Sequence, residues 1–122
     1  MSLDPRLATV VEAARSKKAF RIRLLDVHGL ASFTDTFVFM SGGSDRQNRA
    51  IAEAVEERLR QQGERPISME GDGNGAWILL DYGDFIVHVM DETTRHHYDL
   101  EGLWARGRDL ELPPEPLPPM PH

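Results

Sequence analysis

Acidic side chains and a histidine share one face of the hairpin predicted over residues 75–90. A glycine at position 83 separates two short apolar runs, as in two antiparallel strands joined by a tight turn. Side chains alternate between the faces of a strand, so steps of two divide the hairpin into two sets. One set is wholly apolar and predicts the core side. The other set is mixed and comprises Trp77, Leu79, Asp81, Asp84, Ile86, His88 and Met90.

Two interpretations of this mixed face follow from its composition. An aromatic residue, aliphatic residues and acids on one surface are typical of a protein-docking face. The same set also fits a sheet covered by helices on both sides, with Asp81 and Asp84 simply near the turn. Those two acids would be solvated at a turn, so they do not suggest acid catalysis. Periodicity alone leaves both interpretations open.

The loop Ser41–Ser44 (SGGS) is the candidate for phosphate chemistry. It precedes a predicted helix, where free backbone N–H groups can bind an anion. No lysine follows its glycines, so it is not a P-loop. A nucleotidyltransferase using Gly43 and Ser44 would need paired carboxylates on a following strand to hold metal ions. The next carboxylates lie in the predicted helix, so we expect no catalytic residue and no cofactor. A nucleotide-binding or nucleotidyltransferase-like enzyme remains one alternative.

Metal binding has little support in the residue spacing. The histidines at positions 88, 96 and 97, with Asp91 and Glu92, fit no standard zinc pattern. The acidic loop over residues 70–75 lacks the ligand count and terminal glutamate of an EF-hand loop. The sequence therefore predicts no metal site.

The charge of the chain is concentrated around the hairpin. The net charge is −6, and the segment from Glu64 to Glu92 holds seven acids and one base, Arg65. An acidic surface repels a nucleic-acid backbone, so no direct nucleic-acid readout is expected, and a basic protein partner is favoured. The chain has no cysteine and no apolar run of the ~20 residues that span a bilayer. We expect a cytoplasmic protein that is not in a membrane.

The elements that must position these residues follow the order α-β-β-α-β-β-β-α. This order predicts an α/β (α+β) fold, in which a mixed sheet of about five strands is flanked by helices. At 122 residues the chain suits one domain, expected over residues 1–110, with a flexible proline-rich tail over 111–122. The predicted elements are helices over 3–17, 44–62 and 99–104, strands over 20–27, 36–40 and 67–69, and the two strands of the hairpin.

An ordered set of residues along the chain resembles the Iojap-like ribosomal silencing factors (RsfS). The resemblance covers about residues 5–105 and depends on the whole set, because no single motif is specific. The matching segments are Leu25–Val27, Ser32–Val38, Ser41–Gln47, Glu70–Gly71, Trp77–Asp84, Val87–Val89, Arg95, Tyr98–Glu101 and Leu103–Trp104.

The resemblance implies a nucleotidyltransferase-like fold without catalytic activity. It also implies binding to the large ribosomal subunit through a basic ribosomal protein, L fourteen. The bound factor would sterically block subunit joining and repress translation, and a role in large-subunit biogenesis is implied as well. Family members often form homodimers when free, so a self-associating homodimer module using the same face is a second alternative.

The mixed face and the resemblance together assign roles to its residues. Trp77 is expected to be the buried aromatic anchor, with Leu79, Ile86 and Met90 around it. The acids Asp81, Asp84 and Glu70 would pair with basic side chains of the partner. His88 would form a hydrogen bond within the face. Arg95, Tyr98 and Asp99 are expected instead to order the connection into the last helix.

Overall fold

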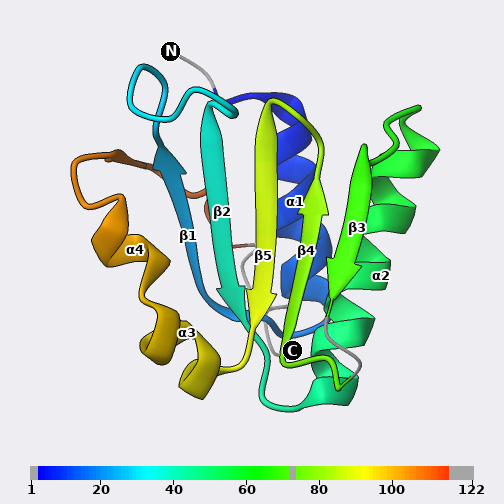
Figure 1. Cartoon of the computed structure of the whole chain (residues 1–122). Helices are drawn as coiled ribbons and strands as arrows, with labels where there is room; N and C mark the ends of the chain where they lie inside the picture. Colours follow the sequence, from blue (N-terminus) through cyan, green and yellow to red (C-terminus); the bar gives the residue numbers. More distant parts are fainter. Residues whose placement is uncertain (1–2, 72–73, 116–122) are drawn as a thin grey trace, which may run out of the picture.

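The structure is a computed structural model of the chain and describes residues 3–71 and 74–115 (Figure 1). Its helices are α1 (Pro5–Ser16), α2 (Asp45–Gln61), α3 (Glu92–Tyr98) and α4 (Leu100–Leu103). Its strands are β1 (Phe20–Asp26), β2 (Thr36–Ser41), β3 (Ser68–Gly71), β4 (Trp77–Asp81), β5 (Phe85–Met90) and β6 (Arg108–Leu110). None of the described helices is long and apolar enough to cross a membrane.

The strands form one mixed sheet in the order β3-β4-β5-β2-β1-β6. The central pair β2 and β5 is parallel, and every other neighbouring pair is antiparallel. This confirms the predicted α+β fold, but the sheet has six strands instead of about five. The sixth strand, β6, has three residues, two of them charged, so no alternating pattern marks it in the sequence.

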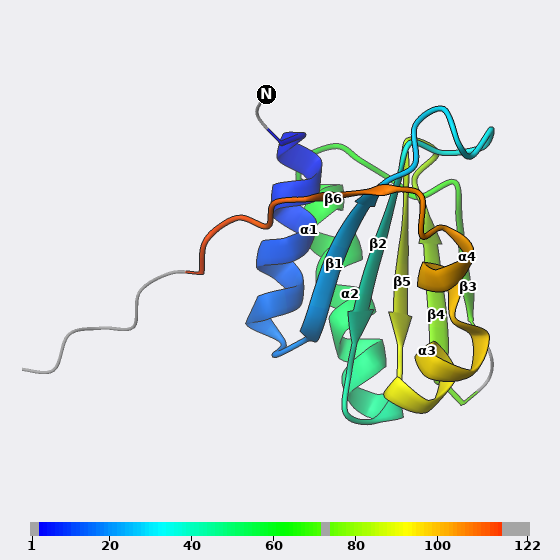
Figure 2. The same ribbon diagram turned by 90° about the vertical axis from the view of Figure 1, so that its left-hand side faces the viewer.

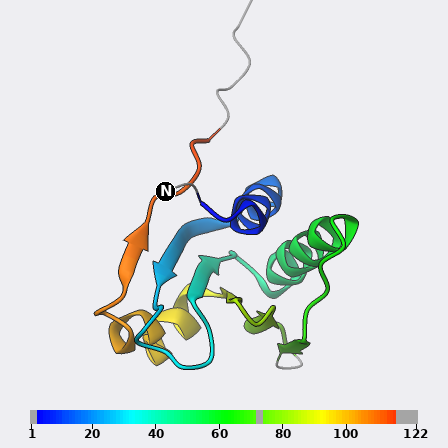
Figure 3. The ribbon, with the colours of Figure 1, turned by 90° about the horizontal axis from the view of Figure 1, so that it is seen from above.

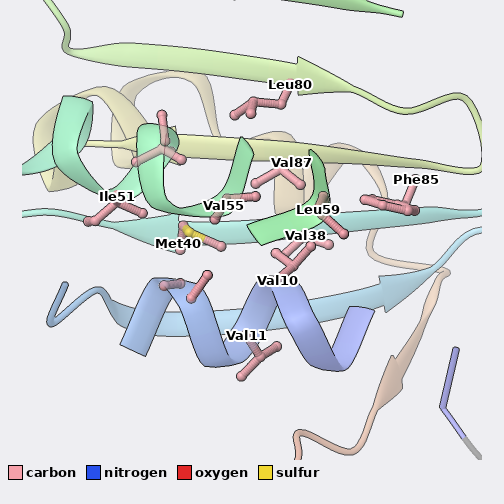
Figure 4. Close-up of a cluster of buried hydrophobic side chains, with 14 of the residues drawn as sticks. Val10, Val11, Val38, Met40, Ile51, Val55, Leu59, Leu80, Phe85 and Val87 are labelled. Carbon is pink, nitrogen blue, oxygen red and sulfur yellow. The ribbon is translucent and has the colours of Figure 1, made fainter. Parts of the chain in front are cut away.

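Helices α1 and α2 cover one face of the sheet and enclose the larger core (Figure 4). The apolar set of the hairpin lies here, as predicted. Both helices begin at the expected signals: the Asp4 carboxylate accepts the N–H of Arg6, and the Ser44 hydroxyl accepts the N–H of Gln47. The buried side chains of this core from the hairpin are Ile78, Leu80, Tyr82, Phe85, Val87 and Val89.

Helices α3 and α4 lie on the opposite face of the sheet (Figures 2 and 3). The sequence predicts only a polar connection where α3 forms, because the segment ETTRHHY has no apolar stripe. The helix begins at Asp91, whose carboxylate accepts the N–H of Thr94, and it buries Arg95. A smaller core lies beneath the two helices and comprises Leu25, Val27, Phe37, Phe39, Ile86 and Met90, with Leu100 and Trp104 packed against it.

The first residues of the expected tail lie against the domain. The Arg15 guanidinium donates a hydrogen bond to the Pro113 carbonyl at 2.7 Å, and Leu112 packs against the larger core. The chain after β6 therefore runs along α1. The rest of the expected tail, from residue 116, lies outside the described residues.

Candidate functional site

The mixed face of the hairpin is divided by α3 and α4 into a covered half and an open half. The covered half lies on β5, where Ile86, His88 and Met90 are only 7%, 4% and 2% exposed. The open half lies on β4 and β3 and comprises Ser68, Glu70, Trp77, Leu79 and Asp81. Its members share one face because Glu70 stands opposite Leu79 and Ser68 opposite Asp81 in the antiparallel register.

This division corrects the prediction for three residues. Ile86, His88 and Met90 are not on a solvent-facing docking surface, because Leu100 and Trp104 pack over the core to which β5 contributes. Helices therefore cover both faces of the sheet at β5, and the accessible part of the mixed face lies on β3 and β4. There, Trp77, Leu79 and Asp81 are half-buried and Glu70 is exposed.

Trp77 stands at the boundary between the two halves. Its indole Nε1 donates a hydrogen bond to Nδ1 of the buried His88 at 3.1 Å. It also packs against Tyr98 of α3, with ring centroids 4.9 Å apart. Contacts from both β5 and α3 therefore hold the indole in one orientation. Sequence reasoning did not place Tyr98 beside Trp77, because α3 was not predicted.

His88 forms the hydrogen bond that was predicted within the face. Its ring stacks on Phe39, with centroids 5.3 Å apart and planes inclined by 18°. Burial lowers the pKa of His88 to about 4, so the imidazole is neutral near pH 7. Since Nδ1 accepts the indole proton, the neutral ring carries its own proton on Nε2. That nitrogen is buried and has no hydrogen-bond partner within the described residues.

A buried arginine attaches α3 and α4 to the sheet. Arg95 donates to the Arg21 carbonyl at 2.8 Å and to the Ser41 hydroxyl at 2.9 Å. Its guanidinium also forms a bidentate pair with Glu101, at 2.8 and 3.0 Å, which lowers the pKa of that carboxyl. Asp99 ends α3 and caps α4 by accepting the N–H of Gly102. Arg95 and Asp99 thus order the last helical connection, as expected.

The two acids near the turn have different surroundings. The Asp81 carboxylate accepts the N–H of Gly83 at 2.8 Å and remains on the open half. Asp84 instead pairs with Arg6 of α1 at 2.9 Å. The backbone N–H of Tyr82 donates to the Phe85 carbonyl, so the two-residue loop is Gly83–Asp84 and Asp84 lies within it. Grouping Asp84 with Asp81 on one face is therefore wrong, since the acid belongs to the turn and not to a strand.

The side chain of Gln47 occupies part of the loop around Gly43 and Ser44. The Gln47 side chain accepts the Gly43 N–H at 2.5 Å and donates to the carbonyls of Lys17 and Lys18. A phosphate at this helix start would have to displace these contacts. The described residues also include no group of three or more His, Asp or Glu side chains placed to hold a metal ion.

A shallow hollow of about 350 Å³ lies on the open half. It is lined by Glu70 and Gly71 of β3 and by Trp77 and Leu79 of β4. An apolar floor with a carboxylate at its rim suits the aliphatic stem and charged head of a lysine or arginine. The open half thus combines a fixed aromatic ring, a hollow and two acids, Glu70 and Asp81.

These features define an α+β protein with a half-open sheet face. The chain matches the family model "Ribosomal silencing factor during starvation" over residues 2–120, and it belongs to this family, RsfS. It is 34% identical over 112 residues to the ribosomal silencing factor RsfS of Halalkalibacterium halodurans, covering 92% of this chain and 96% of that protein.

The family includes relatives beyond bacteria. The chain is 30% identical to mouse "Mitochondrial assembly of ribosomal large subunit protein 1", over 84% of this chain and 47% of that protein. Among solved structures, it is similar to the crystal structure of protein CV0518 from Chromobacterium violaceum. The TM-score is 0.81 and the identity 33%, and the match covers 92% of each chain. The relatives from Halalkalibacterium halodurans and mouse are named as a silencing factor and an assembly protein.

Proposed function

We propose that this chain represses translation by binding the large ribosomal subunit through the basic ribosomal protein L fourteen. The bound chain sterically blocks the joining of the small subunit. The family membership supports a silencing role, and the open half supports the mode of binding. The observation that carries the proposal is the indole of Trp77, fixed between His88 and Tyr98 at the border of an acidic, partly apolar face.

The geometry of Trp77 favours tight docking on physical grounds. An aromatic ring that is already immobilised loses little conformational entropy on binding, so more of its contact energy contributes to affinity. Its N–H is already bonded to His88, so a partner needs to offer only an apolar or cationic group to the ring face. Glu70 and Asp81 add charge complementarity to a basic partner and speed its encounter.

The proposal includes no catalysis. The Gly43 N–H at the helix start is already bonded to the Gln47 side chain, and steric occlusion needs only a bound domain of sufficient size. We propose that the protein acts in the cytoplasm. In the free state, a second copy of the chain would bind the same open half and form a homodimer. Self-association and binding to the large subunit would then compete for this surface. The name of the mouse relative also favours a role in large-subunit biogenesis for this chain.

The test is co-sedimentation of the purified protein with separated large and small subunits, followed by a subunit-joining assay. We expect binding to the large subunit alone, suppression of joining, and loss of both with Trp77→Ala. Leu103→Ala is the matched control, because Leu103 is 72% exposed on α4 and lies outside the open half. Binding without any effect on joining would contradict occlusion. Binding to neither subunit would exclude the ribosome as the target.

A further inference from the structure

The two edges of the sheet are protected to different degrees. At one edge, β6 has three residues, and its charged side chains pair with β1: Arg108 with Asp26 and Asp109 with Arg23. At the other edge, β3 is the outermost strand and, among the strands of the described residues, pairs only with β4 (Figures 1 and 3). Soluble proteins usually block such an edge with lysine, proline or a bulge. Pro66 precedes β3, and the Ile67 N–H donates to Asp81, so protection of this kind lies at the start of the strand. The strand Ser68–Gly71 (SMEG) itself contains neither lysine nor proline.

The register identifies which backbone groups of β3 are free to pair. The N–H of Tyr82 donates to Phe85 across the hairpin, so alternate residues of β4 turn their backbone groups toward β5. The residues between them, Leu79 and Asp81, turn toward β3 and pair with Glu70 and Ser68. The N–H and C=O of Met69 therefore point away from the sheet, toward any strand added beside β3.

The side chains next to this edge indicate the chemistry of an added strand. Met69 stands opposite Leu80 and is 49% exposed, so the edge carries an apolar side chain on the sheet face that α1 and α2 cover. Ile67, just before β3, adds a second exposed apolar side chain and is 74% exposed. The opposite face carries Glu70 and, one strand further in, Asp81. Opposite charges across neighbouring strands are stabilising and like charges are not. A strand with basic side chains on one face and aliphatic side chains on the other would complement both.

We propose that β3 receives an extended basic segment of the large-subunit partner as a seventh, edge-added strand. This inference rests on the proposed function, because it names how the partner of the open half is held. Backbone hydrogen bonds to Met69 would supply affinity, and alternate side chains would supply specificity. Basic side chains on the open-half face would lie beside Glu70 and the hollow over Trp77 and Leu79.

The test compares Met69→Pro with Met69→Leu in co-sedimentation with large subunits. Proline removes the outward N–H without removing a bond to β4, whereas leucine keeps the N–H and the apolar bulk. We expect Met69→Pro to weaken binding by about tenfold, as the loss of backbone pairing requires, and Met69→Leu to bind within about twofold of wild type. Equal binding by both variants would overturn edge addition and leave the proposed function intact. Failure of the wild type to bind would overturn both.

Hydrogen exchange of the wild-type protein gives a second measurement that does not depend on how Met69→Pro folds. We expect the amides of residues 67–71 to exchange more slowly when the large subunit is bound. Unchanged exchange there, in a complex that protects the Trp77 region, would contradict the proposal. So would a Met69→Pro variant that loses self-association but still binds the subunit, because the edge would then serve a second copy of this chain.

Discussion

The covered and open halves of the α3-side sheet face are built from the two strands of one hairpin, yet they have different roles. On β5, Ile86, His88 and Met90 are buried beneath the packing of Leu100 and Trp104. On β4, Trp77 and Leu79 have the same apolar character but remain half-buried. The difference is the extent of α3 and α4, which do not enclose β4. Similar side chains become core or surface according to what a later segment covers.

Trp77 and His88 connect the two halves. The buried imidazole of His88 accepts a hydrogen bond from the indole N–H of Trp77. The covered half therefore holds in place the aromatic ring that the open half exposes. A substitution in the covered half should therefore affect mainly folding, and one in the open half mainly binding. The four predictions below test this separation, from the largest expected effect to the smallest.

The largest effect is expected for Arg95→Ala. The substitution leaves Glu101 without its bidentate partner and the Arg21 carbonyl and Ser41 hydroxyl without their donor. Breaking a buried ion pair from one side costs about 3–5 kcal/mol, so the free energy of unfolding in urea should fall by about that amount. The control is Arg23→Ala, which removes more exposed ion pairs and should cost about 1 kcal/mol or less. Equal losses would show that α3 is not held by Arg95.

Trp77→Ala should weaken binding to the large subunit by about 2 kcal/mol or more, the threshold of an interface hot spot. Ile86→Val is the matched substitution on the covered half. It should lower the free energy of unfolding by about 0.5–1.5 kcal/mol and leave the dissociation constant unchanged. For each variant, equilibrium binding measures the dissociation constant and urea unfolding measures the free energy of unfolding. Unfolding of Trp77→Ala at room temperature would place Trp77 in the core and remove it from the docking face.

Acid should destabilise the covered half through His88. Burial lowers its pKa from 6.5 to about 4 in the folded state, so the unfolded state takes up a proton first as the pH falls. The free energy of unfolding is therefore highest above pH 6.5 and falls progressively toward pH 4. At pH 5 it should be about 2 kcal/mol lower than at neutral pH. His88→Phe should lack this part of the pH dependence. Parallel stability curves for the two proteins between pH 7 and pH 5 would contradict a neutral, buried His88.

The smallest effect is expected for Asp81→Asn. Asparagine can still accept the Gly83 N–H, so the turn is kept and only the charge is removed. The association rate constant with the large subunit should fall about threefold at low salt and become equal to wild type at about 0.5 M salt, because salt screens steering. Asp109→Asn, at the β6 edge, is the control and should bind as wild type. A salt-independent loss would indicate a contact other than charge.

Much of the fold was accessible from local signals. The capping residues Asp4 and Ser44 marked two helices, and the alternation around Gly83 gave the hairpin with its core face. The pattern missed α3 and β6, because α3 is held by one buried arginine and β6 by pairing with β1. Neither has the repeated apolar spacing from which local prediction works. The candidate site was therefore predicted only in part, with Trp77, Leu79, Asp81 and Glu70 on the open half.

The sequence by itself determined the class of the fold, the acidic hairpin and the two sets of side chains on it, because periodicity, turns and charge are local properties. Only the tertiary structure decided which of these side chains a partner can reach. Coverage of β5 depends on contacts between Trp104 and Phe37 and between Arg95 and Ser41, which join strands to the helical segment formed later in the chain. The open edge at β3 likewise exists because, within the described residues, β4 is the one strand that pairs with it. Accessibility is a property of the whole packed domain and has no signature in a short segment.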